Sequence, residues 1–581
     1  MKQSRWTIEF SLYTLAFLLA LTIRLVMLGS TPLNNYESSW AMQALELGRG
    51  QGGAVGPNPA YIVWNALLFD IFGGNNFLAR LIPAAAGALL VLAPAFFKNF
   101  IGRPQAILFA FLLAVDPGLA AVSRTADGQM LALSLTVLAF GALVSRRTRL
   151  AGFLAGLVII AGPSIWHGLL VLVSAWGLSR LFLRVREAGE PDGKAVIFDW
   201  IPWKAGAITL GITAFLAGTL LFFYPGGVGG FASSLPTYFS SWVEASGVPA
   251  LRIPIALVVY QPLGVVFGLI GAVRAWRDRA SAGRASRFLS LWFLTALLLT
   301  IIRPGRQVDD LIWALVPLLG IASIEIVRIF ASRPEGQSFY VAAGQALLLF
   351  IIYIFVWLYL SYLSGLPPES RAEAISGVLY LLIGSLAMVG VVFLLVGLGW
   401  SFRTALHGLS CGAIGLLGLY GFSTLFGAIG LNANPRQEMW VQGSAAGQMD
   451  LMVKTLGELA EWNSGRRDSL EVVVLADTPA IRWALKDWHG AVFATGLQTG
   501  QLPEAIVSFQ GQELPELAAA YAGQDFVFER VLEMGGAVPP DLLGFLEWLI
   551  FRQAPVREEI GILWARADRF PGGTFTSDIS P

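Results

Sequence analysis

Apolar segments long enough to cross a lipid bilayer recur along the first three quarters of the 581-residue chain. A membrane-spanning helix needs about 20 consecutive apolar residues, and soluble chains seldom carry such runs. Only 13% of the residues are charged, against roughly 25% in soluble chains, and 56% are hydrophobic. The sequence therefore predicts a mainly α-helical protein that crosses the membrane many times, and it excludes a soluble enzyme.

The apolar windows and the polar residues between them predict about thirteen transmembrane helices. Basic residues such as Arg146, Arg147, Arg284 and Arg287 gather in every second connection, and the positive-inside rule places these connections and the N-terminus in the cytoplasm. An odd number of crossings places the end of the chain outside. The predicted spans are 7–28, 77–97, 104–121, 127–145, 150–163, 165–184, 205–224, 253–273, 288–302, 310–330, 339–363, 376–399 and 405–430.

The balance of charge reverses in the last quarter of the chain. Residues 1–435 hold 28 Lys and Arg against 18 Asp and Glu, whereas residues 436–581 hold 11 against 20. The two parts therefore carry net charges of opposite sign. The acidic last part argues against a nucleic acid as a partner.

The last part also changes its secondary-structure pattern. Short β-branched runs such as 471–476 and 505–509 alternate with helical stretches, which is typical of a small α/β domain. We therefore expect a transmembrane domain at 1–430, with a first outer loop at 29–76, followed by an extracytoplasmic α/β domain at 431–581.

Ionisable side chains near the membrane are costly unless a partner or a function holds them there, so the outer loops are searched first. Glu37 lies in the first outer loop, and it is either a solvated loop acid or a functional carboxylate. Arg124 and Asp127 lie between the third and fourth crossings, and they either pair with each other or contribute to a site. Two acids that meet from separate loops would bind a divalent cation or provide a base beside a charge stabiliser.

A third outer loop combines Arg303 and Arg306 with Asp309 and Asp310. Arginine has a planar fork that matches phosphate oxygens, and two arginines in a Gly/Pro turn suit a pyrophosphate-like or phosphodiester anion. The two aspartates either orient the arginines or face solvent. The loop is therefore a candidate phosphate site.

The order of these motifs resembles a known superfamily. An early acidic residue follows the first helix, the motif Asn-Pro-Ala-Tyr stands at 58–61, and Phe-Leu-Ala-Arg-Leu-Ile-Pro at 77–83 opens the second crossing. Over residues 5–330 the sequence resembles the GT-C superfamily of integral membrane glycosyltransferases, in particular the protein mannosyltransferase and aminoarabinose transferase branch. That family has an Asp-Glu pair in its first loop, and the matching positions here are Tyr36 and Glu37.

The resemblance implies inverting transfer of a sugar from a polyprenyl-phosphate-linked donor to an acceptor at the outer membrane face. Glu37, or Asp127 if Glu37 only positions other groups, would take the acceptor proton, and a divalent cation between these two acids is part of the expectation. Arg303 and Arg306 would hold the lipid phosphate. No nucleotide cofactor is expected. The other residues expected to contact substrate are Asn58, Tyr61, Arg124, Asp309 and Asp310.

Two other classes of function stay open. The tyrosine at position 36 leaves room for a non-catalytic scaffold or lipid-binding protein with the GT-C fold. A lipid or small-molecule transporter is expected to place broken helices near the bilayer midplane, whereas the distinctive charges here lie at the outer ends of helices. We therefore predict a plasma-membrane glycosyltransferase of the cell envelope. Its partners would be a polyprenyl-phosphate-linked sugar, membrane lipid, and an acceptor that is a lipid, a glycan or a protein.

Overall fold

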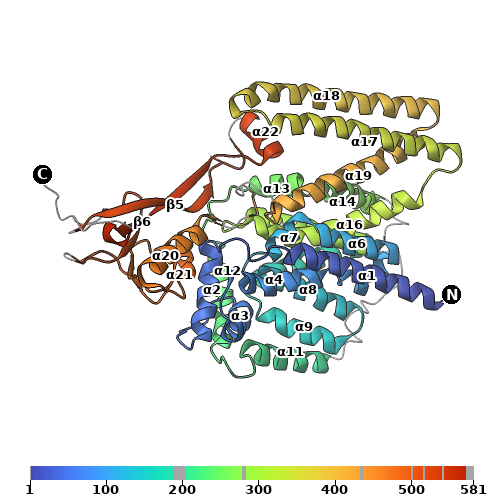
Figure 1. Ribbon diagram of the computed structural model, residues 1–581. Helices are drawn as coiled ribbons and strands as arrows, with labels where there is room; N and C mark the ends of the chain where they lie inside the picture. The colour runs from blue at the N-terminus through green and yellow to red at the C-terminus, as the bar shows by residue number, and fades with distance from the viewer. Residues whose placement is uncertain are drawn as a thin grey trace.

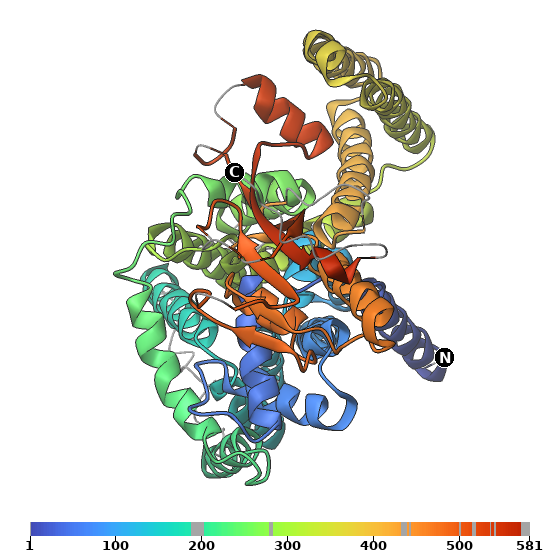
Figure 2. The ribbon, with the colours of Figure 1, turned by 60° about the vertical axis from the view of Figure 1, so that its left-hand side comes forward.

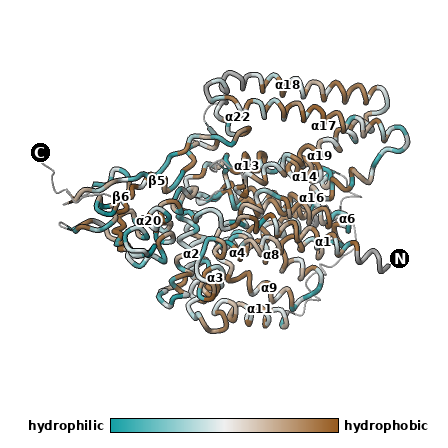
Figure 3. The backbone as a smooth tube through the Cα atoms, in the orientation of Figure 1, coloured by the Kyte–Doolittle hydropathy of each residue, from teal (hydrophilic) through white to brown (hydrophobic). Residues whose placement is uncertain are grey.

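The chain folds into a bundle of helices with a small α/β domain at one end, and α1 (Lys2–Leu25) begins at the far end of the bundle (Figure 1). The bundle helices carry mostly hydrophobic residues, whereas the C-terminal domain and the loops beside it are more hydrophilic (Figure 3). The computed structural model describes residues 2–186, 203–277, 283–431, 438–440, 443–498, 501–513, 517, 519–534, 536–539 and 542–570.

The helices of the bundle follow the predicted apolar segments closely. After α1 they are α2 (Asn35–Gly48), α3 (Pro59–Phe72), α4 (Asn76–Leu90), α5 (Pro94–Ile101), α6 (Arg103–Val115), α7 (Pro117–Ser123), α8 (Gln129–Val144), α9 (Thr148–Ile159), α10 (Ser164–Arg186), α11 (Trp203–Gly218), α12 (Gly227–Ser240), α13 (Arg252–Tyr260), α14 (Pro262–Arg277), α15 (Arg284–Ile302), the 3-10 helix η1 (Val308–Leu311), α16 (Ile312–Ala331), α17 (Gln337–Ser364), α18 (Pro368–Gly399) and α19 (Phe402–Ala428).

Eight helical spans in the described residues have the length and apolar character of a membrane crossing, or up to ten if each of two bent helix pairs is one span. Three predicted crossings correspond to the shorter apolar helices α8, α9 and α11, and α3 is a further apolar helix of this shorter length. The protein is therefore a polytopic helical membrane protein, as predicted. The predicted number of about thirteen crossings is not confirmed.

Both bends occur where a polar residue precedes a proline. The α6–α7 pair bends by 56° at Asp116-Pro117, and the α13–α14 pair bends by 99° at Gln261-Pro262. A proline disfavours a helical conformation in the residue before it, and it fits the first turn of the next helix. The Asp116 carboxylate caps α7 by accepting a hydrogen bond from Leu119 N (2.7 Å). The sequence thus specifies both breaks locally.

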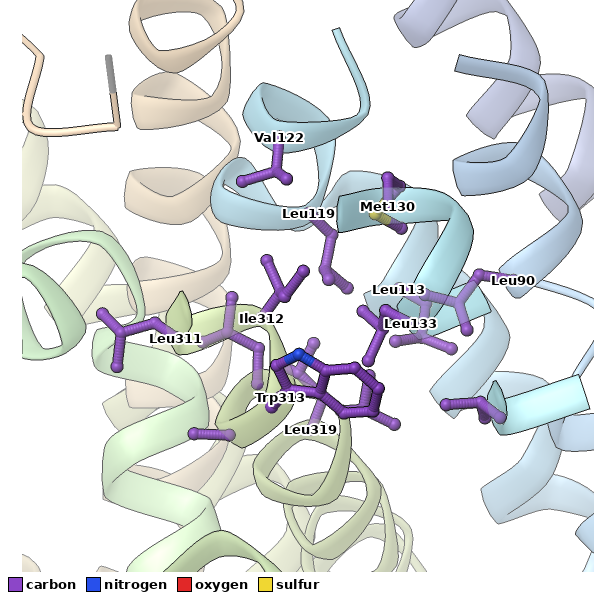
Figure 4. Packing of buried hydrophobic residues seen from close by; sticks show 14 of the residues in the cluster. Leu90, Leu113, Leu119, Val122, Met130, Leu133, Leu311, Ile312, Trp313 and Leu319 are labelled. Carbon is purple, nitrogen blue, oxygen red and sulfur yellow. The ribbon is translucent and has the colours of Figure 1, made fainter. Parts of the chain in front are cut away.

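The largest buried cluster of apolar side chains holds the bundle together beneath the loops near the C-terminal domain. Trp313 of α16 is fully buried among side chains that include Leu113, Leu119 and Leu133 (Figure 4). Its indole Nε1 donates a hydrogen bond to Ser164 Oγ (3.1 Å), so its polar atom is satisfied. This packing fixes the starts of α7, α8 and α16, which are the helices next to the predicted site loops.

The C-terminal domain contains one mixed sheet. In the described residues its strand order is β1-β5-β6-β4-β2-β3, with β2 parallel to β3 and β4 and the other neighbours antiparallel. The predicted strands at 471–476 and 505–509 correspond to β2 and β4, which confirms the α/β character. The elements are β1 (Ala445–Ala446), α20 (Met449–Ser464), β2 (Val472–Val474), α21 (Pro479–Ala484), β3 (Ala491–Phe493), β4 (Ala505–Phe509), β5 (Tyr521–Leu532), α22 (Leu542–Phe551), β6 (Val556–Arg566) and the 3-10 helix η2 (Ala567–Arg569).

The C-terminal domain is attached to the first outer loop by specific hydrogen bonds. Asn34 Nδ2 donates to Ser444 O (2.9 Å), and Asn35 Oδ1 accepts from Ala480 N (3.0 Å). Figure 2 shows the strands of the domain over the end of the bundle near α2. The residues around position 36 therefore lie between the bundle and the C-terminal domain.

Candidate functional site

The first outer loop enters α2 through a capping box that includes Glu37. The Asn34 side chain accepts a hydrogen bond from Glu37 N (2.9 Å), and Glu37 Oε2 accepts one from Asn34 N (3.3 Å). These reciprocal bonds satisfy two N–H groups at the start of the helix, where the helix dipole also favours a negative charge. The local sequence therefore fixes the position of Glu37 in the first turn of α2.

Arg80 of α4 neutralises Glu37. Its Nε donates to Glu37 Oε1 (2.7 Å) and its Nη2 to Oε2 (2.6 Å), and each of the two side chains is only 6% exposed. Glu37 Oε1 also accepts a hydrogen bond from Ala126 N (3.0 Å). Charge-assisted bidentate pairs of this kind are among the strongest polar contacts in proteins. Glu37 therefore joins α2, α4 and the loop before α8, and both of its oxygens are engaged.

Asp127 lies in that loop, buried beneath α2. Its Oδ1 accepts a hydrogen bond from Gln129 N (3.0 Å), and its Oδ2 accepts one from the Tyr36 hydroxyl (3.3 Å). Burial raises the pKa of Asp127 to about 7, although these two hydrogen bonds act in the opposite direction. Tyr36 stands where the first-loop motif of the GT-C family has an aspartate. Here its hydroxyl donates a hydrogen bond to the Asp127 carboxylate.

The loop before α16 brings two aspartates to the same place in different surroundings. Asp310 forms an ion pair with Arg303, and its Oδ2 also accepts from Gln307 N (2.8 Å). Asp309 is 5% exposed, and its Oδ1 has no hydrogen-bond partner in the described structure. The Gln129 side-chain amide donates a hydrogen bond to the Asp309 carboxyl group. Among the described residues, the direct ion pair of Arg303 is thus with Asp310, while its charge acts on Asp309 from further away.

Three loops that are distant in sequence thus form one buried polar cluster. Tyr36 interacts electrostatically with Asp127 and Asp309, and Asp127 interacts with Glu37 and Asp310. Arg303 supplies a positive charge at the edge of the cluster. We call this cluster, made of Tyr36, Glu37, Arg80, Asp127, Gln129, Arg303, Asp309 and Asp310, the acidic cluster.

Arg124 and Arg306 bind backbone instead of the acidic cluster. Arg124 Nη1 donates to the carbonyl oxygens of Arg24 (2.9 Å) and Val26 (2.8 Å) at the end of α1, where carbonyl groups lack helical partners. Arg306 donates from Nε to Ile301 O (3.0 Å) and from Nη1 to Val248 O (2.9 Å). Both arginines therefore shape their loops.

Asn58 and Tyr61 lie next to the acidic cluster. Tyr61 is fully buried and interacts electrostatically with Glu37 and Asp127, but its hydroxyl donates to Ala79 O (2.9 Å). The Asn58 side chain packs against Gly128, directly after Asp127, and a side chain at that glycine would collide with it. Both residues are thus placed to support the Asp127 loop.

Several residues of the site were not assigned a role from the sequence. Arg80 lies in the 77–83 motif. Its charge at the start of an apolar helix is the feature that could have identified it as a site residue. Nothing in the sequence marks Gln129 as a site residue except its position close to Asp127. His167 Nδ1 is buried without a partner in the described residues, while its Nε2 lies 3.3 Å from Thr300 Oγ1. Arg303 also stacks over the Tyr238 ring at 5.9 Å.

A cavity of about 490 Å³ opens beside the acidic cluster, between the bundle and the C-terminal domain. Asp309 is part of its wall, as are Gln307 and Val308 from the same loop. Its volume lies within the range of roughly 300–1,000 Å³ that is usual for small-molecule sites. The Asp309 carboxylate is therefore the acid of the cluster that borders this cavity.

The predicted metal site does not fit this geometry. A divalent cation needs free carboxylate oxygens, and Glu37 has both oxygens engaged by Arg80 and by backbone N–H groups. Within the described ranges, no group of three or more His, Cys, Asp or Glu side chains is placed to hold a metal ion. We therefore derive no step through a metal ion.

The fold and the acidic cluster define a multi-pass membrane protein with buried carboxylates beneath an α/β domain. No protein-family model and no curated protein matches the sequence. Among solved structures, the chain is similar to ArnT from Cupriavidus metallidurans bound to undecaprenyl phosphate, with 14% identity, a TM-score of 0.48, and coverage of 83% of this chain and 85% of that chain.

The chain is also similar to the oligosaccharyltransferase of Archaeoglobus fulgidus. The apo form shows 11% identity and a TM-score of 0.42, and the match covers 82% of this chain and 63% of that chain. A complex of that enzyme with Zn and sulfate shows 13% identity and a TM-score of 0.40, over 81% of this chain and 61% of that chain. Both ArnT and this oligosaccharyltransferase are GT-C enzymes, the superfamily that the sequence resembles.

Proposed function

We propose that the protein is a membrane glycosyltransferase that moves a sugar from a polyprenyl-phosphate-linked donor to an acceptor hydroxyl. The observation that carries this proposal is the acidic cluster itself, in which Asp127 from one loop meets Arg303 and Asp309 from another at one end of the bundle. The class of donor follows from the resemblance of the sequence to GT-C enzymes. A carboxylate base beside an arginine suits a reaction that frees a proton and a phosphate.

In the proposed reaction the acceptor oxygen attacks the anomeric carbon of the donor sugar. A new carbon–oxygen bond forms as the bond between that carbon and the phosphate oxygen breaks, and the electron pair of the broken bond stays on the polyprenyl phosphate. The acceptor proton goes to the carboxylate pair. Asp309 borders the cavity, so it is the better placed of the two to take the proton.

Asp127 and Arg303 have supporting roles in this proposal. The pKa of Asp127 is raised by burial to about 7, so the carboxylate pair exchanges a proton near neutral pH. Arg303 has a buried Nε without a described partner besides its ion pair with Asp310. A free donor on a fixed guanidinium is suited to the charge that develops on the leaving phosphate. Glu37, by contrast, positions the loops.

The test is a transfer assay on the purified full-length protein with a panel of polyprenyl-phosphate sugars. We expect at least one donor to be consumed by the wild type, and the Asp127→Asn variant to lose about 100-fold or more of the rate. Asp525→Asn, at an exposed position of β5, is the matched control and should keep the rate. Consumption of no donor by the wild type would favour the non-catalytic scaffold.

Transport is a second candidate, because the two bent helix pairs meet through polar residues. The Gln261 side chain interacts electrostatically with Asp116, and each residue stands at a break in an apolar span. Broken helices with polar groups at the break are typical of secondary transporters. If this candidate holds, Gln261→Leu should reduce lipid or solute flux in proteoliposomes while sugar transfer is absent from the wild type.

A further inference from the structure

Helix α22 differs in composition from the rest of the C-terminal domain. Its ten residues, Leu542–Phe551, include one charged side chain, Glu547, and are otherwise glycine, aliphatic or aromatic. A helix of this length spans about 15 Å, which is roughly half of the hydrocarbon core of a bilayer. An apolar helix that is too short to cross a membrane belongs either to the core of a protein or to the membrane interface.

The helix does not pack on the sheet of its own domain. Among the described residues, the two buried apolar clusters around that sheet are built from other elements. Trp548 belongs instead to the largest buried cluster of the bundle, and Phe545 and Leu549 pack against the same cluster. These three residues follow the i, i+3, i+4 spacing and therefore share one face of the helix. With this face, α22 docks on the membrane bundle.

Strands β5 and β6 form an arm that carries α22 away from the sheet. β5 pairs with β6 as far as its first residue, Val556, whereas β4 pairs with β6 only as far as Gly561. The two-stranded ladder thus continues past β4, and it leads to α22 near one end of α17 and α18 (Figure 1). The guanidinium of Arg552, directly after α22, lies 4.9 Å from the ring centre of Trp548 and 5.0 Å from that of Tyr260 in α13, which fixes the tip of the arm.

The arm ends at the level where the membrane spans of α17 and α18 end. α22 contacts α18, and only 6% of the residues in the apolar span of α18 are buried inside the protein, so this span faces lipid. The apolar span of α17 ends at Leu363, and that of α18 begins at Gly377. Close to these limits, Tyr362 and Tyr380 are 64% and 76% exposed. Exposed tyrosines at the ends of spans are typical of the membrane–water interface.

A second face of α22 is apolar and not used for docking. Leu546 and Ile550, which are four residues apart, are partly exposed, and neither is part of the buried apolar clusters of the described residues. They point away from the face that carries Trp548. This apolar face is next to the lipid-facing surface of α18, so the two form one continuous surface.

We propose that α22 is a membrane anchor of the C-terminal domain, and that bilayer lipid covers its free face. In this arrangement Leu546 and Ile550 contact the lipid chains just below the headgroups, and Glu547 lies at the level of the headgroups. The C-terminal domain is then held in two ways, by its hydrogen bonds to the first outer loop and by an arm in the lipid surface. The inference is independent of the transfer reaction.

Spin-label accessibility in lipid nanodiscs tests the anchor directly. The one cysteine, Cys411, is replaced by alanine, and nitroxides are attached to Leu546→Cys and Ile550→Cys. Leu386→Cys, 74% exposed in the span of α18, is the lipid control, and Trp462→Cys, 69% exposed on α20, is the water control. We expect both α22 labels to resemble the lipid control, with severalfold higher accessibility to oxygen than to a water-soluble nickel chelate.

Crosslinking of the unmodified protein gives a second measurement without any substitution. Nanodiscs are prepared with a phosphatidylcholine that carries a diazirine in its acyl chain, and the crosslinked peptides are identified by mass spectrometry. We expect crosslinks in α22 and α18, and none in α20. Crosslinks in α18 without any in α22 would overturn the inference. So would α22 labels that resemble the water control, or that are shielded from both reagents because protein covers this face.

Discussion

Glu37 and Asp309 are both buried carboxylates in the acidic cluster, but their partners differ. Glu37 has a bidentate guanidinium at 2.6 and 2.7 Å and accepts two backbone N–H groups as well. Asp309 has an amide donor, one oxygen without a partner, and two other aspartates close enough to repel it. The first acid is paired with a guanidinium, whereas the second has no direct ion pair among the described residues and borders a cavity.

This difference in partners indicates which of the two buried acids is suited to accept a proton from a substrate. An ion pair that satisfies both oxygens of a carboxylate, together with backbone N–H groups, leaves no lone pair for substrate. A carboxylate that lies among other acids and has no direct ion pair readily accepts a proton. The comparison assigns stability to the Glu37–Arg80 pair and proton transfer to the Asp127–Asp309 pair, and each of the following changes tests one side of it.

The largest effect is expected for Asp309→Asn. Removing the proposed base should lower the transfer rate by about 10²–10⁴-fold, the usual size of general-base catalysis. The melting temperature should stay equal or rise, because the amide removes a charge that Asp127 and Asp310 repel. Transfer kinetics and thermal unfolding of the same preparation measure both quantities. A variant that keeps its rate, or that loses rate only because it unfolds, would contradict the assignment.

Arg80→Met should act on stability instead. Removing one partner of a buried ion pair leaves an uncompensated charge and is expected to lower the free energy of unfolding by about 3–5 kcal/mol. The double variant Arg80→Met/Glu37→Gln should recover much of this loss, since no unpaired charge remains. Denaturant unfolding in detergent micelles compares the two. Equal stability of the single variant and the wild type would show that Glu37 does not depend on Arg80.

Arg303→Lys keeps the positive charge beside Asp310 but removes the planar fork. We expect about tenfold weaker binding of a polyprenyl phosphate, equivalent to the loss of one charge-assisted hydrogen bond. Arg306→Lys is the matched control, because Arg306 binds the carbonyl oxygens of Ile301 and Val248. Titration of both variants with the lipid phosphate separates the two arginines. An equal loss of affinity in both variants would mean that the phosphate site depends on the two arginines together.

The smallest effect concerns Tyr36. Because a deprotonated carboxylate pair is needed, transfer should increase as pH rises through about 7, where Asp127 loses its proton as its pKa predicts. The Tyr36 hydroxyl stabilises the charged form of Asp127, so Tyr36→Phe should raise that pKa and move the midpoint of the pH–rate profile upward by about half to one unit. A downward shift would mean that Tyr36 does not act through Asp127.

Much of the fold could be predicted from the sequence, because apolar runs and prolines act locally. The helices lie where the apolar windows predict them, and the breaks at Asp116-Pro117 and Gln261-Pro262 follow from local chemistry. The number of crossings could not be predicted equally well. Helices such as α9 and α11 are short, and hydropathy does not show whether a short helix spans, bends or packs inside.

The candidate site was predictable at the level of loops and not at the level of partners. The sequence identifies Asp127, Arg303 and Asp309 as charges in outer loops, and the structure places them in one cluster. The sequence does not show that Arg80 neutralises Glu37, or that Arg124 and Arg306 bind backbone carbonyls. The charge of a residue alone does not reveal which group it will contact.

The most direct test of the account compares the two acids in one assay. The transfer rate per folded molecule is measured for Asp309→Asn and for the double variant Arg80→Met/Glu37→Gln, with the folded fraction determined on the same samples. The account predicts that the double variant keeps at least about a tenth of the wild-type rate, while Asp309→Asn loses about 100-fold or more. A fully active Asp309→Asn beside an inactive, folded double variant would contradict it.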